Sequence, residues 1–377
     1  MVNLTFRDLI HNKTKFLLIV IGLSVSMFLV QYSAGMYNGV LEQSTDAFDR
    51  FDFDTWVMTE DADNFFEGGP INDSTYEIIK TMTDVEDAER LIFANVNFET
   101  KDYVADVTLL GYELNSEKIE PWDIIKGDIE DLDEENTVII DETIKNNFPE
   151  LKIADDVQIG EAKMKIVGFC KNTRFMFTPY AWASIETARN AIPYYGNWSN
   201  MIGVELKSDS DVDDLQDNID ELSDLGIIED LKVFTKQELK ENTHTMIINE
   251  GGLGGAIYTL VGLGFFVAMI IITVVMYQSI QEKIPEFGTL KAIGASKGFI
   301  NKMLLGQVFI YITLSFILGT FFAILFDLSG GGAGMPILLD IFASIYIYLA
   351  YLAVGIACSM FSIKKVHRID PAIVFKG

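Results

Sequence analysis

Carboxylates are the residues whose number and spacing first suggest chemistry in this chain. Asp209, Asp211 and Asp213 have the alternate spacing of a calcium-binding loop, and a second acidic cluster spans residues 131–135. A calcium loop also needs a glycine at its sixth position and a glutamate at its twelfth. The first cluster lacks that glycine and has Asp220 at the twelfth position. We therefore expect both clusters to be solvated acidic surface, and we predict no metal site.

The other reactive residues form no recognisable catalytic pattern. The sequence contains no Gly-x-Ser-x-Gly, His-Glu-x-x-His or paired-cysteine motif. Of its two cysteines, Cys170 and Cys358, we expect Cys170 to be a small buried residue rather than a nucleophile. A P-loop motif is also absent, so the chain cannot bind ATP in that way. We predict that this chain is not itself an enzyme and has no cofactor of its own.

Charge and hydropathy are strongly segregated along the chain. Its 377 residues include 55 acidic and 28 basic ones, which gives a net charge of −27. This acidity argues against a nucleic-acid partner, because such a surface needs clustered Lys and Arg. The mean hydropathy is nevertheless positive, at +0.24. Charged and apolar residues must therefore occupy different segments.

Four runs without Asp, Glu, Lys or Arg contain the apolar residues. They span residues 16–41, 251–281, 303–326 and 341–363. Each is long enough for a transmembrane helix, which needs about 20 apolar residues. The first run exceeds the apolar core of a signal peptide, so we expect a retained helix. Ionisable residues are scarce in the runs, and Asp340 only borders the fourth, so transport driven by protons or ions is disfavoured.

The basic residues indicate the orientation in the membrane. Residues 41–250 contain 49 acidic and 17 basic residues, and the eleven remaining bases lie in the N-terminus, the 282–302 loop and the C-terminal tail. Positive residues in short flanks mark the cytoplasmic side. Because the chain would cross the membrane four times, its N-terminus, the 282–302 loop and its C-terminal tail would all lie on the cytoplasmic side. We predict a multi-pass protein of the cytoplasmic membrane with both termini cytoplasmic and the large segment outside.

The large segment has the pattern of a folded α+β domain. Runs rich in β-branched and aromatic residues predict strands at 55–58, 90–98, 103–110, 137–140, 157–169 and 201–206. The spacing of Val212, Leu215, Ile219 and Leu222 predicts an amphipathic helix over 211–225. A further helix over 236–248 could continue into the second span.

The predicted fold class is an α-helical membrane protein with four transmembrane helices and a large extracytoplasmic α+β domain inserted between the first and second helices. Residues 1–41 form the N-terminus and first helix, and residues 42–250 form the outer domain. Residues 251–377 contain three helices, the inner loop 282–302 and the tail 364–377.

Two sets of residues in the spans could serve a site. Gly251 with Gly255, and Gly264 with Ala268, form small-x-x-x-small pairs that allow close helix packing, either within one chain or between protomers. The outer half of the first span has a partly polar set of side chains. These are either interfacial residues or the lining of an outward-facing substrate vestibule: Met27, Gln31, Tyr32, Met36 and Tyr37.

The inner loop predicts a short helix across the membrane surface. Pro285 suits a first helical turn, and Glu286 beside it suits the positive end of the helix. Gly294 followed by Ser296 indicates a helix stop and a new cap before the third span. Such an element is well suited to contact a cytoplasmic partner.

The stretch Glu286-Phe-Gly-Thr-Leu-Lys-Ala-Ile-Gly-Ala-Ser296 resembles the signature loop of FtsX-like permeases, the membrane subunits of MacB-type (type VII) ABC transporters. The tail from Arg368 to Gly377, with Pro371 and Ala372, is similar to that family's C-terminal end, and the order of spans matches. The chain length and the Phe-Gly-Thr-Leu sequence of the loop most resemble the DevC and HrtB branch, whose members export glycolipids or haem. Gln307 departs from the family, in which many members have Glu.

The resemblance implies a homodimeric permease in membrane lipid, docked on cytoplasmic ATPase subunits that bind ATP and Mg. The coupling residues would be Pro285, Glu286, Phe287, Gly288, Thr289, Leu290, Lys291, Gly294 and Ser296. ATP-driven motion would then export or extract a hydrophobic or amphiphilic substrate by mechanotransmission to the outer domain. The alternative is a signalling subunit that regulates an extracytoplasmic protein, as cell-division FtsX does.

Substrate identity stays open between lipid or glycolipid, haem and peptide. Met, Tyr and His side chains can all ligate haem iron. Residues of these types occur near the expected outer interface at Met27, Tyr32, Tyr37, His244 and Met246, but no spacing fixes a ligand pair.

Overall fold

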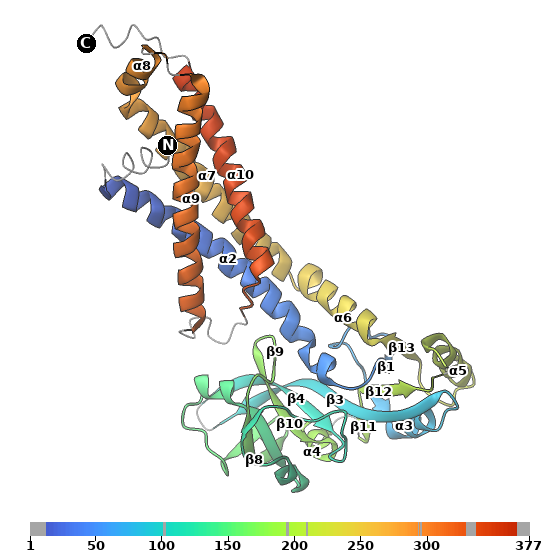
Figure 1. Ribbon diagram of the computed structural model, residues 1–377. Coiled ribbons are helices and arrows are strands. Elements are labelled where there is room, and N and C mark those ends of the chain that lie inside the picture. Colours follow the sequence, from blue (N-terminus) through green and yellow to red (C-terminus); the bar gives the residue numbers. More distant parts are fainter. Residues whose placement is uncertain are drawn as a thin grey trace. The chain divides into compact units, whose positions relative to one another are not determined.

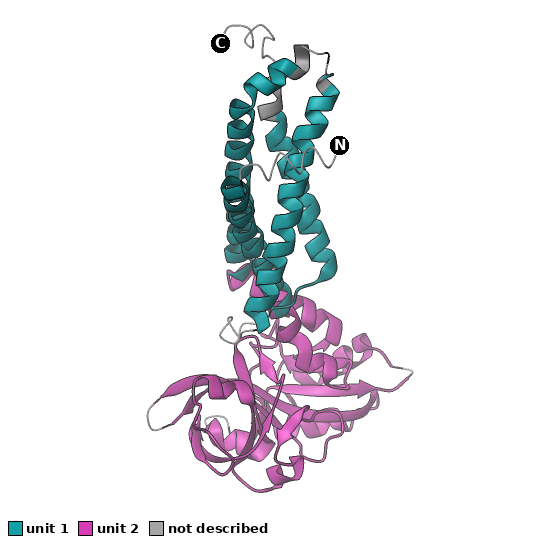
Figure 2. Cartoon of the chain, turned by 60° about the vertical axis from the view of Figure 1, so that its left-hand side comes forward, with its two compact units in different colours: residues 1–39, 253–377 teal, residues 40–252 magenta. Residues whose placement is uncertain are grey.

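The computed structural model describes residues 13–100, 103–193, 196–208, 210–292, 294, 296–328 and 337–367. It divides the chain into two compact units, residues 1–39 with 253–377, and Val40–Gly252 (Figure 2). We call these the membrane unit and the outer unit. The predicted N-terminus up to residue 12 and the tail from residue 368 lie outside the described residues, as does Asp209 of the acidic cluster.

The membrane unit is a bundle of long helices (Figure 1). It contains α7 (Leu253–Glu282), α9 (Lys297–Leu328), α10 (Ile341–His367) and the first part of α2 (Lys13–Arg50). All four are apolar and long enough to cross a membrane, which confirms the predicted fold class. Ser26 on α2 donates a hydrogen bond to the Gly264 carbonyl at 2.7 Å and lies 2.9 Å from the Tyr351 hydroxyl. Polar contacts of this kind join α2, α7 and α10 inside an otherwise apolar core.

A cap explains the one acidic residue at the edge of the fourth span. The Oδ2 atom of Asp340 accepts a hydrogen bond from the Ala343 N–H at 2.7 Å, and its carbonyl accepts one from Ser344. The residue therefore satisfies orphan N–H groups at the start of α10. This contact gives Asp340 a structural role at the helix end.

The outer unit is built on one large sheet. In the described residues its strand order is β13-β1-β12-β3-β4-β10-β6-β8-β5. Outside this order, β7 pairs with β3 and β8, and β9 pairs with β10. The strands are β1 (Thr55–Thr59), β3 (Val85–Glu99), β4 (Val104–Tyr112), β5 (Ile124–Lys126), β6 (Thr137–Asp141), β7 (Asp156–Ile159), β8 (Ala162–Cys170), β9 (Arg174–Phe175), β10 (Thr178–Ser184), β12 (Met201–Leu206) and β13 (Leu231–Thr235). β2 (Ile71–Asn72) and β11 (Trp198–Ser199) form a separate pair.

The outer unit has two halves that share β3. The α3–α5 half packs α3 (Asp73–Lys80) and α5 (Val212–Asp224) on β1, β12, β13 and the start of β3, around a core that includes Val57, Ile79 and Ile219. The α4 half packs α4 (Ile185–Ala191) on β4, β6, β7, β8, β10 and the end of β3. The β3–β4 ladder runs from Leu91 to Glu99 and connects the halves.

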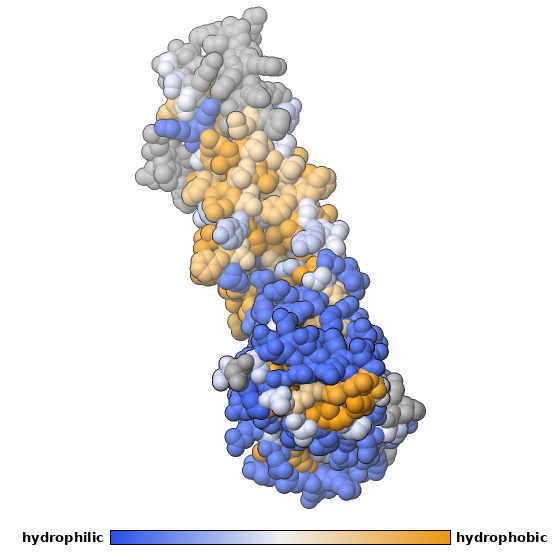
Figure 3. All heavy atoms as spheres, turned by 90° about the vertical axis from the view of Figure 1, so that its right-hand side faces the viewer, coloured by the Kyte–Doolittle hydropathy of each residue, from blue (hydrophilic) through white to orange (hydrophobic). Residues whose placement is uncertain are grey.

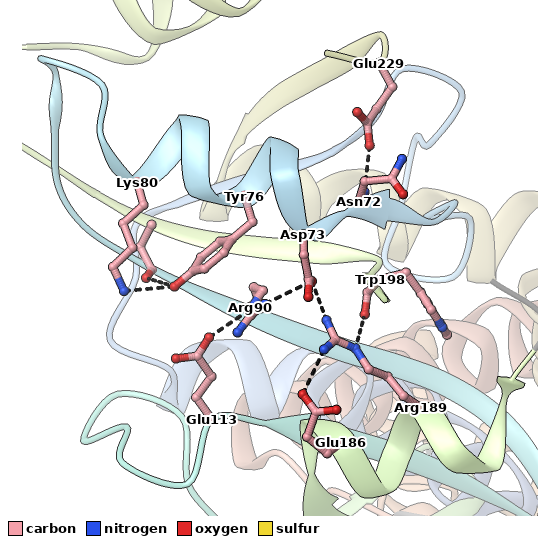
Figure 4. Close-up of polar contacts among 11 residues, drawn as sticks. Asn72, Asp73, Tyr76, Lys80, Arg90, Glu113, Glu186, Arg189, Trp198 and Glu229 are labelled. Carbon is pink, nitrogen blue, oxygen red and sulfur yellow. Dashed lines mark hydrogen bonds and ion pairs between the residues drawn. The ribbon is translucent and has the colours of Figure 1, made fainter. Parts of the chain in front are cut away.

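Ion pairs also join the two halves (Figure 4). Asp73 at the start of α3 pairs with Arg90 of β3 at 2.9 Å and with Arg189 of α4. Arg90 also contacts Glu113 at 2.8 Å, and Arg189 donates to the Trp198 carbonyl at 2.9 Å. The Arg189 side chain is only 7% exposed. One carboxylate thus bridges two arginines from different elements, and one of these is almost fully buried.

Three predicted elements need correction. The run 157–169 is not one strand but β7 and β8, which turn back on each other at Gly160, where φ is +55°. The helix predicted over 236–248 is α6 (Lys236–Thr245) followed by a π turn over Met246–Glu250. It does not continue into α7, because the chain leaves helical geometry at Gly252, where φ is +69°. α2, in contrast, extends beyond residue 41 to Arg50.

Candidate functional site

The inner loop is organised around α8 (Ile284–Ala292). Phe287 is fully buried in the core of the membrane unit, and Gly288 beside it is buried as well. Pro285, Glu286 and Thr289 are exposed, and the Thr289 hydroxyl donates to the Pro285 carbonyl at 3.0 Å. α8 is therefore anchored by one apolar side chain and presents polar residues to its surroundings.

The predicted stop and cap after α8 are confirmed. Gly294 has φ of +93°, a left-handed conformation that side chains disfavour. Ser296 then accepts the Phe299 N–H on its hydroxyl at 3.2 Å and begins α9. The side chains of Leu290 and Lys291 lie outside the described residues. At the end of α7, Glu282 forms an ion pair with Lys15 of α2 at 2.8 Å.

The structure does not bring the five vestibule residues together on one open surface. Met27 is fully buried in the helix core, and Gln31 is buried with its amide donating to Thr320 at 2.7 Å. Tyr32 is half-buried against Phe326, and Tyr37 against Tyr258. Met36 is half-buried. A vestibule role for Met27 and Gln31 stays a prediction that requires the bundle to open.

The two glycine pairs have different surroundings. A Cβ added to Gly264 would lie 2.4 Å from a Val30 methyl, and Ala268 is fully buried, so this pair allows α7 to approach α2. A Cβ on Gly255 would meet no atom within 4 Å. Gly251 is exposed and precedes α7. Within the described part of one protomer, only the second pair is a packing contact.

Sequence reasoning missed an apolar hollow on the membrane unit. It has a volume of about 670 Å³ and is lined by α2 and α9 through Ile21, Ser24, Val25, Phe28, Phe322, Leu325 and Phe326. On α2 these residues recur at intervals of three and four, so they share one face. The same periodicity is present in the sequence, but apolar residues also occupy the other faces of this run, so the pattern does not single out this face.

In the outer unit the reactive side chains have structural partners. The side chains of Asp211 and Asp214 cap α5 reciprocally. Burial raises the pKa of Cys170 to about 12, and its sulfur contacts the Thr173 hydroxyl. A ring nitrogen of His244 lies 3.0 Å from the Leu41 carbonyl, and burial lowers the pKa of this histidine. In the described residues no cluster of three or more His, Cys, Asp or Glu could hold a metal ion.

Two solved structures are similar to part of the chain. The chain is similar to the periplasmic region of MacB from Actinobacillus actinomycetemcomitans, with 13% identity, a TM-score of 0.39, and coverage of 52% of this chain and 94% of that one. The extracellular domain of the ABC-type transporter YknZ from Gram-positive bacteria gives 13% identity, a TM-score of 0.37, and coverage of 48% and 100%.

Sequence comparisons span the whole chain. A protein named as a hemin transport system permease protein, HrtB, of Staphylococcus haemolyticus is 20% identical over 382 residues, which cover 100% of this chain and 99% of that one. The FtsX-like permease C-terminal model matches residues 258–371, and the MacB-like periplasmic core domain model matches residues 16–222, more than half of the chain. With four apolar helices and a periplasmic-type domain inserted after the first, the chain belongs to the FtsX-like, MacB-like family of ABC-transporter permeases.

Proposed function

We propose that this chain is the permease half of an ATP-driven machine that exports or extracts a hydrophobic or amphiphilic substrate by mechanotransmission. Two copies would form a homodimer above two cytoplasmic ATPase subunits, with both termini on the ATPase side. Membership of this permease family supports an ATPase partner on a separate chain. The clustering of bases in the N-terminus, inner loop and tail supports the orientation.

The continuity of α2 carries this proposal. α2 is one helix from Lys13 to Arg50, and it crosses the boundary between the membrane unit and the outer unit without a break. Its last turns belong to the outer unit, where Phe48 stacks on Phe65. The other connection is interrupted at Gly252. A continuous helix transmits displacement along its axis, so α2 is the natural transmission element.

The arrangement of α8 supports the input side of the machine. Its buried Phe287 would carry movement of the helix into the bundle, while the exposed Glu286 and Thr289 remain available to an ATPase. Reversal of charge in Glu286→Lys should weaken co-purification of the ATPase. Loss of the ATPase in this variant but not in Glu286→Gln would assign the effect to charge.

A kink in α2 tests the transmission. Glu42 is exposed, so Glu42→Pro removes one helical hydrogen bond and bends the helix without removing a packed side chain. In proteoliposomes with the ATPase, we expect Glu42→Pro to retain ATP hydrolysis but to lose transport of labelled lipid or hemin by about tenfold. The matched variant Glu42→Ala should transport like the wild type. Equal transport by both variants would contradict mechanotransmission through α2.

The hollow between α2 and α9 supports a hydrophobic substrate. Six of its seven lining residues are apolar, so it suits an acyl chain or another apolar group. Hemin is the substrate class suggested by the name of the relative HrtB. A hemin-dependent absorption shift in the purified protein, lost in Met27→Ala, would support hemin. Absence of any shift would leave lipid or peptide.

An exposed apolar area favours signalling as a second candidate function. Figure 3 shows this area on the otherwise hydrophilic outer unit, on the face near α5. The turn after α5 exposes Leu225 (66%) and Ile227 (53%). Apolar patches of this kind mark protein-interaction sites. A photo-crosslinker at residue 225 that captures an extracytoplasmic enzyme, combined with no detectable export, would favour this role.

A further inference from the structure

A cleft in the outer unit lies over the middle of β3. Its volume is about 610 Å³, within the range of known ligand sites. One wall comes from Phe66, the segment Gly68–Gly69–Pro70, Trp198 and Asn200, and the other from Gly160, Glu161, Ala191 and Ile192. The floor is β3 from Phe93 to Asn97, with Glu99 beyond it. The cleft therefore separates the two halves of the outer unit at the strand they share.

The pairing of β3 is interrupted along this floor. On the side opposite β4, β12 pairs with β3 as far as Leu91, and β7 pairs with it again from Phe98. The Asn200 side chain fills part of the gap, because it accepts the Phe93 N–H and donates to the Phe93 carbonyl, both at 2.9 Å. At the other end the Gly160 N–H donates to the Asn97 carbonyl at 2.9 Å.

Asn95 lies midway between these two contacts. Main-chain groups alternate in direction along an antiparallel strand, so those of Asn95 point to the same side as those of Phe93 and Asn97. No described strand pairs with Asn95 on that side. One N–H and one C=O thus face the cleft as an open strand position, the arrangement that an extended peptide can complete.

The charges in the cleft favour a peptide with cationic side chains. Its described lining includes Glu99 and Glu161 but no Lys, Arg or His. The surrounding segment, residues 41–250, has 49 acidic and 17 basic residues and attracts cations at long range. The half-buried Phe66, Val96 and Ile192 supply apolar contact. The matching ligand alternates cationic and apolar side chains.

We propose that the outer unit binds a short cationic peptide in extended conformation, which adds to β3 at Asn95 with its positive side chains beside Glu99 and Glu161. The ligand class is a free basic peptide. This binding requires neither ATP nor the ATPase, so it stands or fails separately from the proposed export function.

The test uses the full chain in lipid nanodiscs. The probe is a fluorescein-labelled, end-capped hexapeptide of alternating lysine and valine, followed by anisotropy. We expect saturable binding, and we expect hydrogen exchange to slow at the Asn95 amide. The matching glutamate–valine peptide should not bind. A lysine–valine peptide with every backbone amide N-methylated should bind about tenfold more weakly, because neither of its edges can donate an N–H to the Asn95 carbonyl. Equal binding of the methylated peptide would overturn the proposal.

Charge reversal supplies the matched variants. Glu99 and Glu161 are exposed, so the double variant Glu99→Lys/Glu161→Lys should fold and should weaken binding about tenfold or more. The control Glu221→Lys/Asp224→Lys makes the same charge change on exposed residues of α5 and should change affinity less than about twofold. Equal loss in both variants would mean non-specific attraction, and no binding up to about 1 mM would exclude the site.

Discussion

Asp73 links the two halves of the outer unit through two ion pairs. Its carboxylate is shared by Arg90 and Arg189, and Arg189 has little access to water. Without Asp73, Arg189 would keep only the exposed Glu186 and the Trp198 carbonyl as partners. Weakening the compensation of a largely buried charge costs more than the loss of a surface pair. The stability of this unit should therefore be unusually sensitive to one carboxylate among many.

We expect Asp73→Asn to destabilise the outer unit by about 3 kcal/mol. All four tryptophans lie within Val40–Gly252, so tryptophan emission in urea reports this unit specifically. Asp54→Asn is the control, because Asp54 is fully exposed and lies 4.0 Å from Lys236. If both variants unfold at the same urea concentration, the network contributes nothing beyond surface charge.

His244 should make the outer unit sensitive to acid. Burial lowers its pKa below the ordinary value of 6.5, although Asp49 and Glu241 oppose this. As the pH falls, the imidazole of His244 therefore binds a proton at a higher pH in the unfolded state than in the folded state. Its protonation lowers the free energy of unfolding progressively as the pH falls below about 6.5. His244→Gln lacks that proton site. We expect its stability relative to the wild type to rise between about pH 7.5 and pH 5; a constant difference would contradict the assignment.

At the scale of elements, helix ends and close approaches explain most of the small and polar residues of the membrane unit. Asp340 and Ser296 begin helices, and Gly264 admits α2 at short range. From the sequence alone, the residue types and spacing also suit a transport or dimerisation site. Their structural roles yield predictions that differ from those of a transport or dimerisation site.

Asp340 should be replaceable by another cap. Asn caps helices about as well as Asp, while Ala does not. Asp340→Asn should leave ATP-driven transport unchanged, whereas Asp340→Ala should lower helix stability by about 1 kcal/mol, seen as earlier thermal unfolding in detergent. Loss of transport in Asp340→Asn would show that the carboxylate charge itself is needed.

The two glycines of α7 should respond differently to a larger side chain. Gly264→Val places atoms against Val30 and the Ser26 carbonyl, so we expect poor yield of folded protein. Gly255→Val meets open space within the protomer and should fold normally. Size-exclusion chromatography would then report the oligomeric state of the folded variant. A folded but monomeric Gly255→Val variant would place this glycine between protomers.

The sequence allowed the spans and α8 to be predicted because charge-free runs, Pro285 and Gly294 are local signals. Other features depend on contacts between distant segments. α2 continues to Arg50 because Ala47 and Phe48 join the core of the outer unit. Asp73, Arg90 and Arg189 are far apart in the chain, so no spacing could pair them. The cleft over β3 is likewise defined by where two other strands end.

At the scale of the whole molecule, the chain consists of two units with separate cores. The outer unit has its own sheet and apolar clusters, and all eleven described strands of that sheet lie within residues 40–252. Its acidic surface favours solubility. Its three apolar clusters are formed entirely by residues of the outer unit.

The outer unit should therefore fold alone. We expect residues 40–252, expressed without the membrane helices, to be soluble and to give the circular dichroism of a mixed α/β domain with a cooperative thermal transition. Aggregation, or a spectrum without strand signal, would show that the sheet depends on the membrane unit.

The way β3 is shared also determines how the outer unit would respond to force. A pull along this strand is resisted by the whole β3–β4 ladder from Leu91 to Glu99 acting at once. A bending load that opens the cleft meets no ladder there and falls on side-chain contacts, among them the ion pairs of Asp73 and the hydrogen bond from Arg189 to the Trp198 carbonyl. The unit is thus stiff in tension and compliant in bending. In an optical trap, Asp73→Asn should leave the rupture force along β3 unchanged while it lowers the force for opening the cleft.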